Sequence, residues 1–200
     1  MKIPTKEQAI NLLKEGSKLN PGRWVTHAEF AGLAAKLIAK NIPSLDSEVC
    51  YVLGILHDIG RMFGVKQMSH IIDGYNFMMK KNFGWVARIS LTHSFPLKDT
   101  SIVFGKWDCS ESDYNFVKNF IDKTEYDDYD RIIQLADYLS LPEGFTILEK
   151  RMIDIAMRYG TNENSVLKWK ALFEIKEYFD QKAGQSIYNF LPDIEKITFS

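Results

Sequence analysis

The stretch Val49-Cys50-Tyr51-Val52-Leu53-Gly54-Ile55-Leu56-His57-Asp58-Ile59 places apolar side chains around every face of a helix. A helix that is apolar all round has no face for water, so we expect it at the centre of the protein. Most of the remaining chain also shows helical spacing of apolar residues, and no pair of strongly alternating strands appears. The sequence therefore predicts an all-α fold, a helical bundle around this segment.

The expected helices follow from this spacing and from residues that start or stop helices. Their approximate ranges are 6–19, 23–40, 47–63, 69–81, 84–93, 111–122, 126–140, 145–159 and 163–182. The segment 94–110 interrupts the pattern with Pro96, Gly105 and Asp108. We expect a long loop there, with a short extended piece at 102–104.

The composition predicts a single domain over residues 1–200 and excludes one class of partner. The chain is 46% hydrophobic and 26% charged, which is typical of a folded protein. Its 25 basic and 26 acidic residues leave a net charge of −1, whereas general nucleic-acid binding needs a basic surface. We therefore expect no general nucleic-acid binding.

The sequence gives no sign of a membrane segment or of a disulfide. The residues after Met1 lack the apolar stretch of a signal peptide, and the longest nearly apolar run, 49–56, is too short to span a bilayer. Cys50 and Cys109 lie far apart and form no metal-binding motif. These features predict a cytoplasmic protein that does not interact with membranes.

Ionisable residues within apolar helices are the feature that points to function. Asp58 must carry charge at neutral pH, and a buried carboxylate is costly unless it is paired or binds a metal ion. Its neighbour His57 lies on the apolar stripe of the same expected helix. Adjacent residues on a helix lie about a hundred degrees apart, so the two side chains can flank one ion.

The other three histidines and a second acid occupy similar positions. His27 lies on the apolar stripe of its helix, His93 ends another stripe, and Asp137 lies in the apolar run 132–139. His70 lies at an expected helix start, where the helix dipole disfavours imidazolium and so favours the neutral, metal-binding imidazole. The alternative is that each is a core residue with an ordinary hydrogen-bond partner. A single metal site would explain all six positions at once, so we favour it over six separate explanations.

This donor set indicates which ions the site would hold. Four imidazoles and two carboxylates without a thiolate suit Fe, Mn, Zn, Co or Ni. Six ligands exceed the four of a closed zinc site, and they could serve two ions about 3.5–4 Å apart. We therefore expect one or two divalent transition-metal ions.

The order of these residues resembles that of the HD-domain metal-dependent phosphohydrolase superfamily. The resemblance rests on three features of the chain: the ordered ligands His27, His57-Asp58 and Asp137, the string Leu56-His57-Asp58-Ile59-Gly60-Arg61, which is similar to the HDIG variant, and the segment 135–138. It covers about residues 26–140, which we interpret as the metal-site core. The helices expected at about 145–182 lie outside it.

The resemblance implies an all-α bundle with a metal ion held by His27, His57, Asp58 and Asp137. His70 and His93 match the additional histidines of members with two metal ions, such as the bacterial hydrolases that cleave symmetrical dinucleoside tetraphosphates. The short interval from Asp58 to His70 departs from that group. Fe and Mn are the favoured ions.

The implied activity is hydrolysis of a phosphate ester or anhydride, with a nucleotide or small phosphorylated metabolite as substrate. A metal-activated water would attack phosphorus, and Asp58 would bind the metal and orient this nucleophile. Arg61 follows Asp58 by three residues and His57 by four, so we expect it to bind a substrate phosphate. Lys66 and Lys98 are further phosphate-binding candidates. The alternative for all three is a side chain in water.

Two other functions stay open at this point. Some members of the superfamily are di-iron oxygenases of small molecules, and they also present four histidines and two aspartates. Iron content and oxygen-dependent turnover would separate them from a phosphohydrolase. The third function is a non-catalytic signalling or binding module, although such relatives typically lack ligands that this chain retains.

Three segments outside the ligand set also carry predictions. The loop aromatics Phe95, Phe104 and Trp107 could stack a base or simply pin the loop to the bundle. The acidic run 122–130 predicts a solvated helix connection. The apolar stripe 166–179 predicts a core face or the surface of a homodimer.

Overall fold

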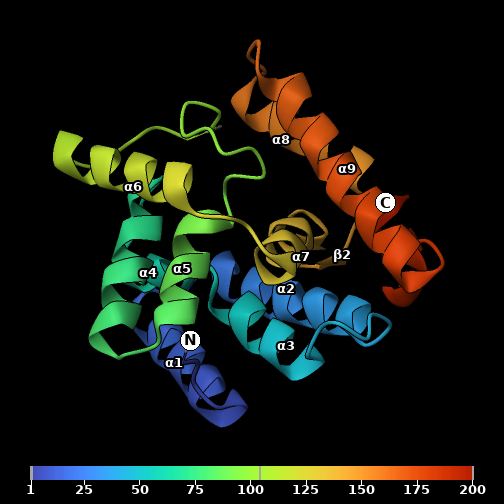
Figure 1. Ribbon diagram of the computed structural model, residues 1–200, viewed down its shortest axis with the longest axis horizontal. Helices are drawn as coiled ribbons and strands as arrows, with labels where there is room; N and C mark the ends of the chain where they lie inside the picture. The colour runs from blue at the N-terminus through green and yellow to red at the C-terminus, as the bar shows by residue number, and fades with distance from the viewer. Residues whose placement is uncertain (1, 104, 200) are drawn as a thin grey trace.

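The computed structural model describes residues 2–103 and 105–199. Its elements in chain order are α1 Lys6–Leu19, α2 Arg23–Ala39, α3 Ser47–Leu56, the 3-10 helix η1 Ile59–Phe63, α4 Ser69–Lys80, α5 Gly84–Thr92, α6 Glu111–Lys123, α7 Asp128–Tyr138, β1 Ser140–Leu141, β2 Gly144–Phe145, α8 Leu148–Tyr159, α9 Ser165–Ala183, the 3-10 helix η2 Ile187–Phe190 and α10 Ile194–Thr198. The prediction of an all-α bundle is confirmed (Figure 1).

Local chemistry fixes where several of these helices begin. The Thr5 side chain accepts a hydrogen bond from the Gln8 amide while the Gln8 side chain bonds back to Thr5, which forms a capping box before α1. Asp46 accepts from the amides of Glu48 and Val49 at the start of α3. These side chains satisfy amide groups that the first turn of a helix leaves without partners.

Helix α3 lies at the centre of the bundle, as its apolar sequence predicts. It packs most extensively against α2, and glycines allow this close approach. A Cβ atom on Gly32 would lie 2.2 Å from Ile55 Cγ2, and one on Gly54 would lie 2.6 Å from the Cα of Gly32. The small residues therefore bring the two helix backbones together, and with them the rings of His27 and His57, whose centroids are 5.3 Å apart.

The expected single helix over 47–63 is wrong in one respect that matters for the site. Helix α3 ends at Leu56, and the chain then turns into η1. The His57 amide bonds to the Gly54 carbonyl, and the Asp58 backbone has φ −102° and ψ 16°, so the turn tightens and changes direction there. A 3-10 turn repeats every three residues and keeps apolar residues on one side, so the pattern alone could not separate it from a continuing helix.

Residues after Tyr138 differ from the expected helices in a second place. Instead of a helix that begins at residue 145, a short antiparallel hairpin pairs Ser140 with Phe145 and Leu141 with Gly144. Gly144 has φ 148°, a backbone conformation that residues other than glycine rarely adopt. The strands contain two residues each, too few for an alternating pattern to be seen in the sequence. Elements η2 and α10 were not expected.

The acidic run 122–130 is not simply solvated, because its last residue is fully buried. Asp130 accepts hydrogen bonds from Arg88 Nε over 3.1 Å and from the Thr92 hydroxyl over 2.8 Å. These contacts join α5 to α7, the helices that carry His93 and Asp137 at their ends. The sequence predicted an exposed carboxylate at this position because its cationic partner, Arg88, lies 42 residues earlier in the chain.

The long loop over 94–110 is confirmed for its described residues, and its aromatics hold it to the bundle. Phe95 is buried, and the Trp107 ring stacks on it with centroids 6.1 Å apart. The Trp107 indole donates to the Thr100 carbonyl over 3.1 Å. Phe104, the third aromatic of the prediction, lies outside the described residues.

Helices α8 and α9 form a C-terminal helix pair along one side of the bundle, beyond α7 and the β-hairpin (Figure 1). On α9, Leu172, Ile175 and Phe179 are buried, which confirms the core part of the predicted stripe, while Val166 and Phe173 are exposed. The homodimer stays a prediction. Over the described residues, no helix is both long and apolar enough to cross a membrane.

Candidate metal centre

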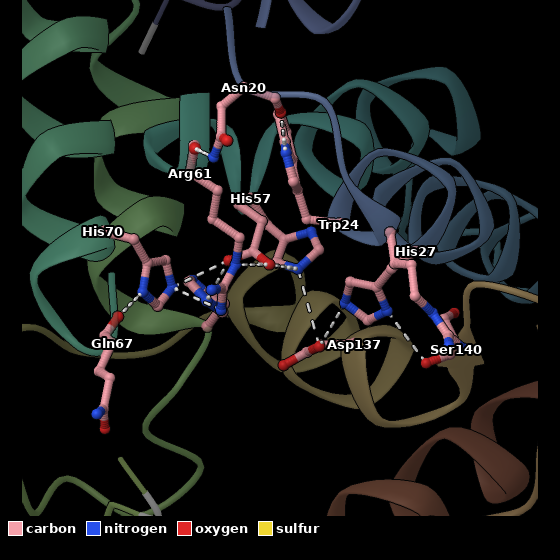
Figure 2. A network of polar contacts seen from close by, with 12 residues as sticks. Asn20, Trp24, His27, His57, Arg61, Gln67, His70, Asp137 and Ser140 are labelled. Carbon is pink, nitrogen blue, oxygen red and sulfur yellow. Dashed lines mark hydrogen bonds and ion pairs between the residues drawn. The ribbon is translucent and has the colours of Figure 1, made fainter. Parts of the chain in front are cut away.

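All six candidate ligands meet at one place in the bundle, although they come from five separate segments of the chain. Figure 2 labels four of them, His27, His57, His70 and Asp137. Their ligand atoms form three overlapping groups, and within each group the atoms lie within 4.8 Å of one another. The groups are His27, His57 and Asp58; His57, His93 and Asp137; and Asp58, His70 and His93. The structure thus brings together every residue that the sequence proposed as a ligand.

One end of the centre, here called the outer end, consists of His27 and Asp137. His27 Nε2 lies 2.9 Å from Asp137 Oδ1, and His57 Nε2 lies 3.8 Å from the same oxygen. His27 belongs to the second turn of α2 and Asp137 to the last turn of α7. Their side chains are 12% and 19% exposed, so this end of the centre reaches the surface.

The other end, here called the inner end, consists of His70 and His93 and is buried. His70 Nε2 lies 3.0 Å from Asp58 Oδ1, and His93 Nε2 lies 3.6 Å from it. Gly60 makes this arrangement possible, because a Cβ atom there would lie 1.9 Å from the His70 carbonyl oxygen. The glycine lets η1 rest on α4 and brings His70 up to Asp58.

Backbone carbonyls orient all four imidazole rings in the same way. Each Nδ1 donates to a carbonyl oxygen, and the acceptors are Ser140 for His27, Gly54 for His57, Gln67 for His70 and Ile89 for His93. In a neutral ring whose Nδ1 carries the proton, Nε2 is an unprotonated acceptor. The four Nε2 atoms therefore point toward the carboxylates of Asp58 and Asp137.

Burial keeps the central rings neutral. It lowers the pKa of His57, and it lowers that of His93 to about 3, against the opposing attraction of Asp58. The carboxylates stay ionised in spite of burial, which by itself would raise their pKa values. Arg61 and His57 hold the pKa of Asp58 well below its usual range, and the close approach of His27, whose Nε2 lies 2.9 Å from Asp137 Oδ1, does the same for Asp137.

This chemistry fits metal ions. The neutral rings of His57 and His93 direct Nε2 lone pairs at carboxylate oxygens, and the two kinds of atom repel each other unless a cation lies between them. The lowered pKa values of these two rings disfavour a proton in that role. Among the described side chains, His57 Nε2 and Asp58 Oδ1 are buried without a hydrogen-bond partner. Asp58 is shared by the outer and inner groups, as a carboxylate between two ions would be.

Arg61 lies beside the centre, where its spacing placed it, but its guanidinium is engaged by a ligand (Figure 2). Its Nε donates to Asp58 Oδ2 over 2.6 Å. The Asn20 amide donates to the Arg61 carbonyl over 2.6 Å, and the Trp24 indole donates to the Asn20 carbonyl over 2.8 Å. The side chain is still 33% exposed, so Arg61 both orients Asp58 and faces solvent.

The two lysine candidates for phosphate binding pair with acids away from the ligands. Lys66 Nζ lies 2.5 Å from Asp73 Oδ2, and Lys98 Nζ lies 3.4 Å from Glu125 Oε1. Lys66 also lines a surface pocket of about 320 Å³ together with three aspartates. No contact recorded for the described residues joins Lys66 or Lys98 to a candidate ligand, so their role as phosphate ligands stays a prediction.

Lys168 on α9 is the charged residue near the centre that the sequence analysis missed. It is only 5% exposed, and its Nζ donates to the Ser94 carbonyl over 3.2 Å, next to His93. The same nitrogen lies 5.7 Å from the ring centroid of Tyr138, next to Asp137. A signal existed, because Lys168 precedes Leu172 by one turn on the buried stripe of its helix.

Comparison with known proteins agrees with this geometry. The family model for the HD domain matches residues 24–141, which contain all six candidate ligands and the whole of the predicted core at about 26–140. No curated protein and no solved structure gives a significant match to the chain. The match covers more than half of the chain and coincides with the ligand-bearing helices, and the protein therefore belongs to the HD-domain family.

Proposed function

We propose that this protein is a metal-dependent phosphohydrolase that cleaves a phosphate ester or anhydride in a nucleotide or small phosphorylated metabolite. The HD domain defines a superfamily of metal-dependent phosphohydrolases. The observation that carries the proposal for this chain is the convergence of four imidazole Nε2 atoms, those of the neutral rings of His57 and His93 among them, on two ionised carboxylates. Members without catalytic function would not need this complete and costly arrangement of buried charge.

The six ligands would hold one or two divalent ions, which when bound supply positive charge for phosphate oxygens and lower the pKa of water. The shared Asp58 carboxylate lies where it can orient the attacking water. In the reaction, the water oxygen forms a bond to phosphorus, the bond from phosphorus to the leaving oxygen breaks, and that oxygen takes up a proton. Arg61, one third exposed beside Asp58, can offer its outer nitrogens to the equatorial phosphate oxygens.

Access to the centre supports a small substrate that arrives at the outer end. His27 and Asp137 are the partly exposed ligands, whereas the side chains of the other four are at most 5% exposed. A substrate phosphate would therefore approach between these two residues and Arg61. The inner end lies behind Asp58 and would position an ion without meeting the body of the substrate.

The test is a screen of phosphorylated metabolites with protein loaded anaerobically with Mn²⁺ or Fe²⁺, with phosphate release as the readout. We expect release that needs the metal and proceeds equally with and without oxygen. An Asp58→Asn variant provides the inactive control. Turnover that consumes oxygen and releases no phosphate would instead assign the protein to the di-iron oxygenases and contradict the proposal.

A further inference from the structure

The C-terminal helix pair approaches the metal centre although it lies outside the matched HD domain. Lys168, in the first turn of α9, donates to the carbonyl of Ser94, which follows the ligand His93. Its ammonium also lies against the ring of Tyr138, which follows the ligand Asp137. The lysine thus lies between the two segments that carry ligands from α5 and α7.

A longer-range electrostatic interaction places the connected end of this helix pair near the same centre. Burial lowers the pKa of Arg61, but Asp58 raises it above its ordinary value, with smaller contributions from Asp137 and from Tyr159. Tyr159 ends α8, and Lys168 lies three residues after the start of α9. The end of the helix pair that joins α8 to α9 therefore reaches the side of the centre where Arg61 and Asp137 lie.

Lys168 is charged and only 5% exposed, and burial of an ammonium group is costly in free energy. Burial lowers its pKa to about 8 while the nearby Asp137 opposes this shift, so the ammonium still carries charge at neutral pH. A methionine or leucine on the buried stripe of α9 would pack without this cost. The two cations interact with different carboxylates. Lys168 interacts electrostatically with Asp137, whereas Arg61 donates a hydrogen bond to Asp58.

We propose that Lys168 is a phosphate-binding residue, a cation that α9 contributes to the metal centre to hold an oxygen of the substrate phosphate. The inference rests on the proposed function, since it assumes a phosphate at the outer end. It adds that the HD core alone does not complete the substrate site. Helix α9 supplies a cation near Asp137, in addition to the one that η1 supplies with Arg61 beside Asp58.

The experiment measures binding of inorganic phosphate to the full chain loaded with Mn²⁺, by calorimetry at fixed ionic strength. Lys168→Gln keeps a donor for the Ser94 carbonyl and removes the charge. We expect it to weaken phosphate binding about ten- to a hundred-fold, the usual loss for a charged hydrogen bond, at unchanged Mn²⁺ content. Lys168→Arg should restore part of the affinity. Lys170→Gln is the matched control, because Lys170 is exposed on the same helix, and it should bind as the wild type does.

Two outcomes would overturn the inference in distinguishable ways. Wild-type affinity in Lys168→Gln would show that the lysine only ties α9 to the loop after His93, and it would leave the proposed function intact. Failure of the wild-type protein with Mn²⁺ to bind phosphate would contradict both proposals. Should Lys168→Gln not fold, Lys168→Met, which suits the buried stripe better, provides the same comparison.

Discussion

The outer end of the candidate metal centre pairs a histidine with an aspartate, the inner end has two histidines, and the two ends differ in their exposure to solvent. His27 and Asp137 at the outer end are 12% and 19% exposed, while His70 and His93 at the inner end are buried at 4% and 3%. The inner histidines come from α4 and α5, which pack directly on each other. The outer ligands lie near the β-hairpin and the C-terminal helix pair. Under the proposed function, we therefore expect the inner end to fix an ion and the outer end to meet the substrate.

The largest effect is expected at Asp58, which the two ends share. Asp58→Asn preserves the volume but removes the charge that faces His57, His70 and His93. We expect metal content to fall from about two ions to nearly none, because both positions lose their common carboxylate. Elemental analysis after reconstitution with Mn²⁺ measures this, with Asp73→Asn as a control for loss of a surface carboxylate. A variant that still holds two ions would show that the ends are independent.

Removal of an inner ligand should distinguish the ion bound at the inner end from the ion bound at the outer end. His93→Ala takes away one of the three residues of the group Asp58, His70 and His93. We expect the stoichiometry to fall from about two ions to about one, since the group His27, His57 and Asp58 stays complete and Asp137 lies beside His27. Metal titration followed by Mn²⁺ spectroscopy measures the number of ions per chain. An unchanged number would reduce the centre to a single ion at the outer end.

Arg61 should affect the substrate more than the metal. Arg61→Ala removes a guanidinium that faces both Asp58 and solvent, and a lost charged hydrogen bond costs about 2–3 kcal/mol, or roughly thirty- to a hundred-and-fifty-fold in kcat/KM. At saturating Mn²⁺ the metal content should be retained. Arg61→Lys should recover only part, because an ammonium cannot reproduce the two-pronged contact. Loss of the metal in Arg61→Ala would mean that its main task is to orient Asp58.

The smallest effect concerns the pH dependence of the metal-free protein. The folded-state pKa of His93 is about 3, below the ordinary value of 6.5, and that of His57 is also lowered. The unfolded chain therefore takes up protons first as the pH falls below about 6.5. Stability is fully present above that pH and declines below it, by up to about 1.4 kcal/mol per pH unit for each group.

Thermal unfolding of metal-free protein at pH 7, 6 and 5 checks this sign. We expect the melting temperature to fall across this range and His93→Gln to flatten the decline, because glutamine does not titrate. The ionised carboxylates contribute little there, since their pKa values lie well below it. A melting temperature that rises toward pH 5 would show that the rings are protonated in the folded state.

The sequence alone predicted the helices and the ligand set because both depend on local rules. Apolar spacing locates a helix within a few residues, and an acid within an apolar run must find a cation wherever the chain folds. It failed at Asp58, where a 3-10 turn replaces the helix, because a tight turn and a helix share the same short-range apolar pattern. It also failed at Asp130, whose partner Arg88 lies on another helix.

The six candidate ligands and the all-α class were thus predicted from the sequence itself, and the structure confirms the fold class and brings the six candidates together. Only the tertiary structure decided that Asp58 is shared, that one end is exposed and that Lys168 reaches the centre from α9. These properties depend on how helices distant in the chain approach one another. That approach is set by contacts such as Gly32 on Gly54 and Gly60 on α4, which no periodic pattern within one helix can encode.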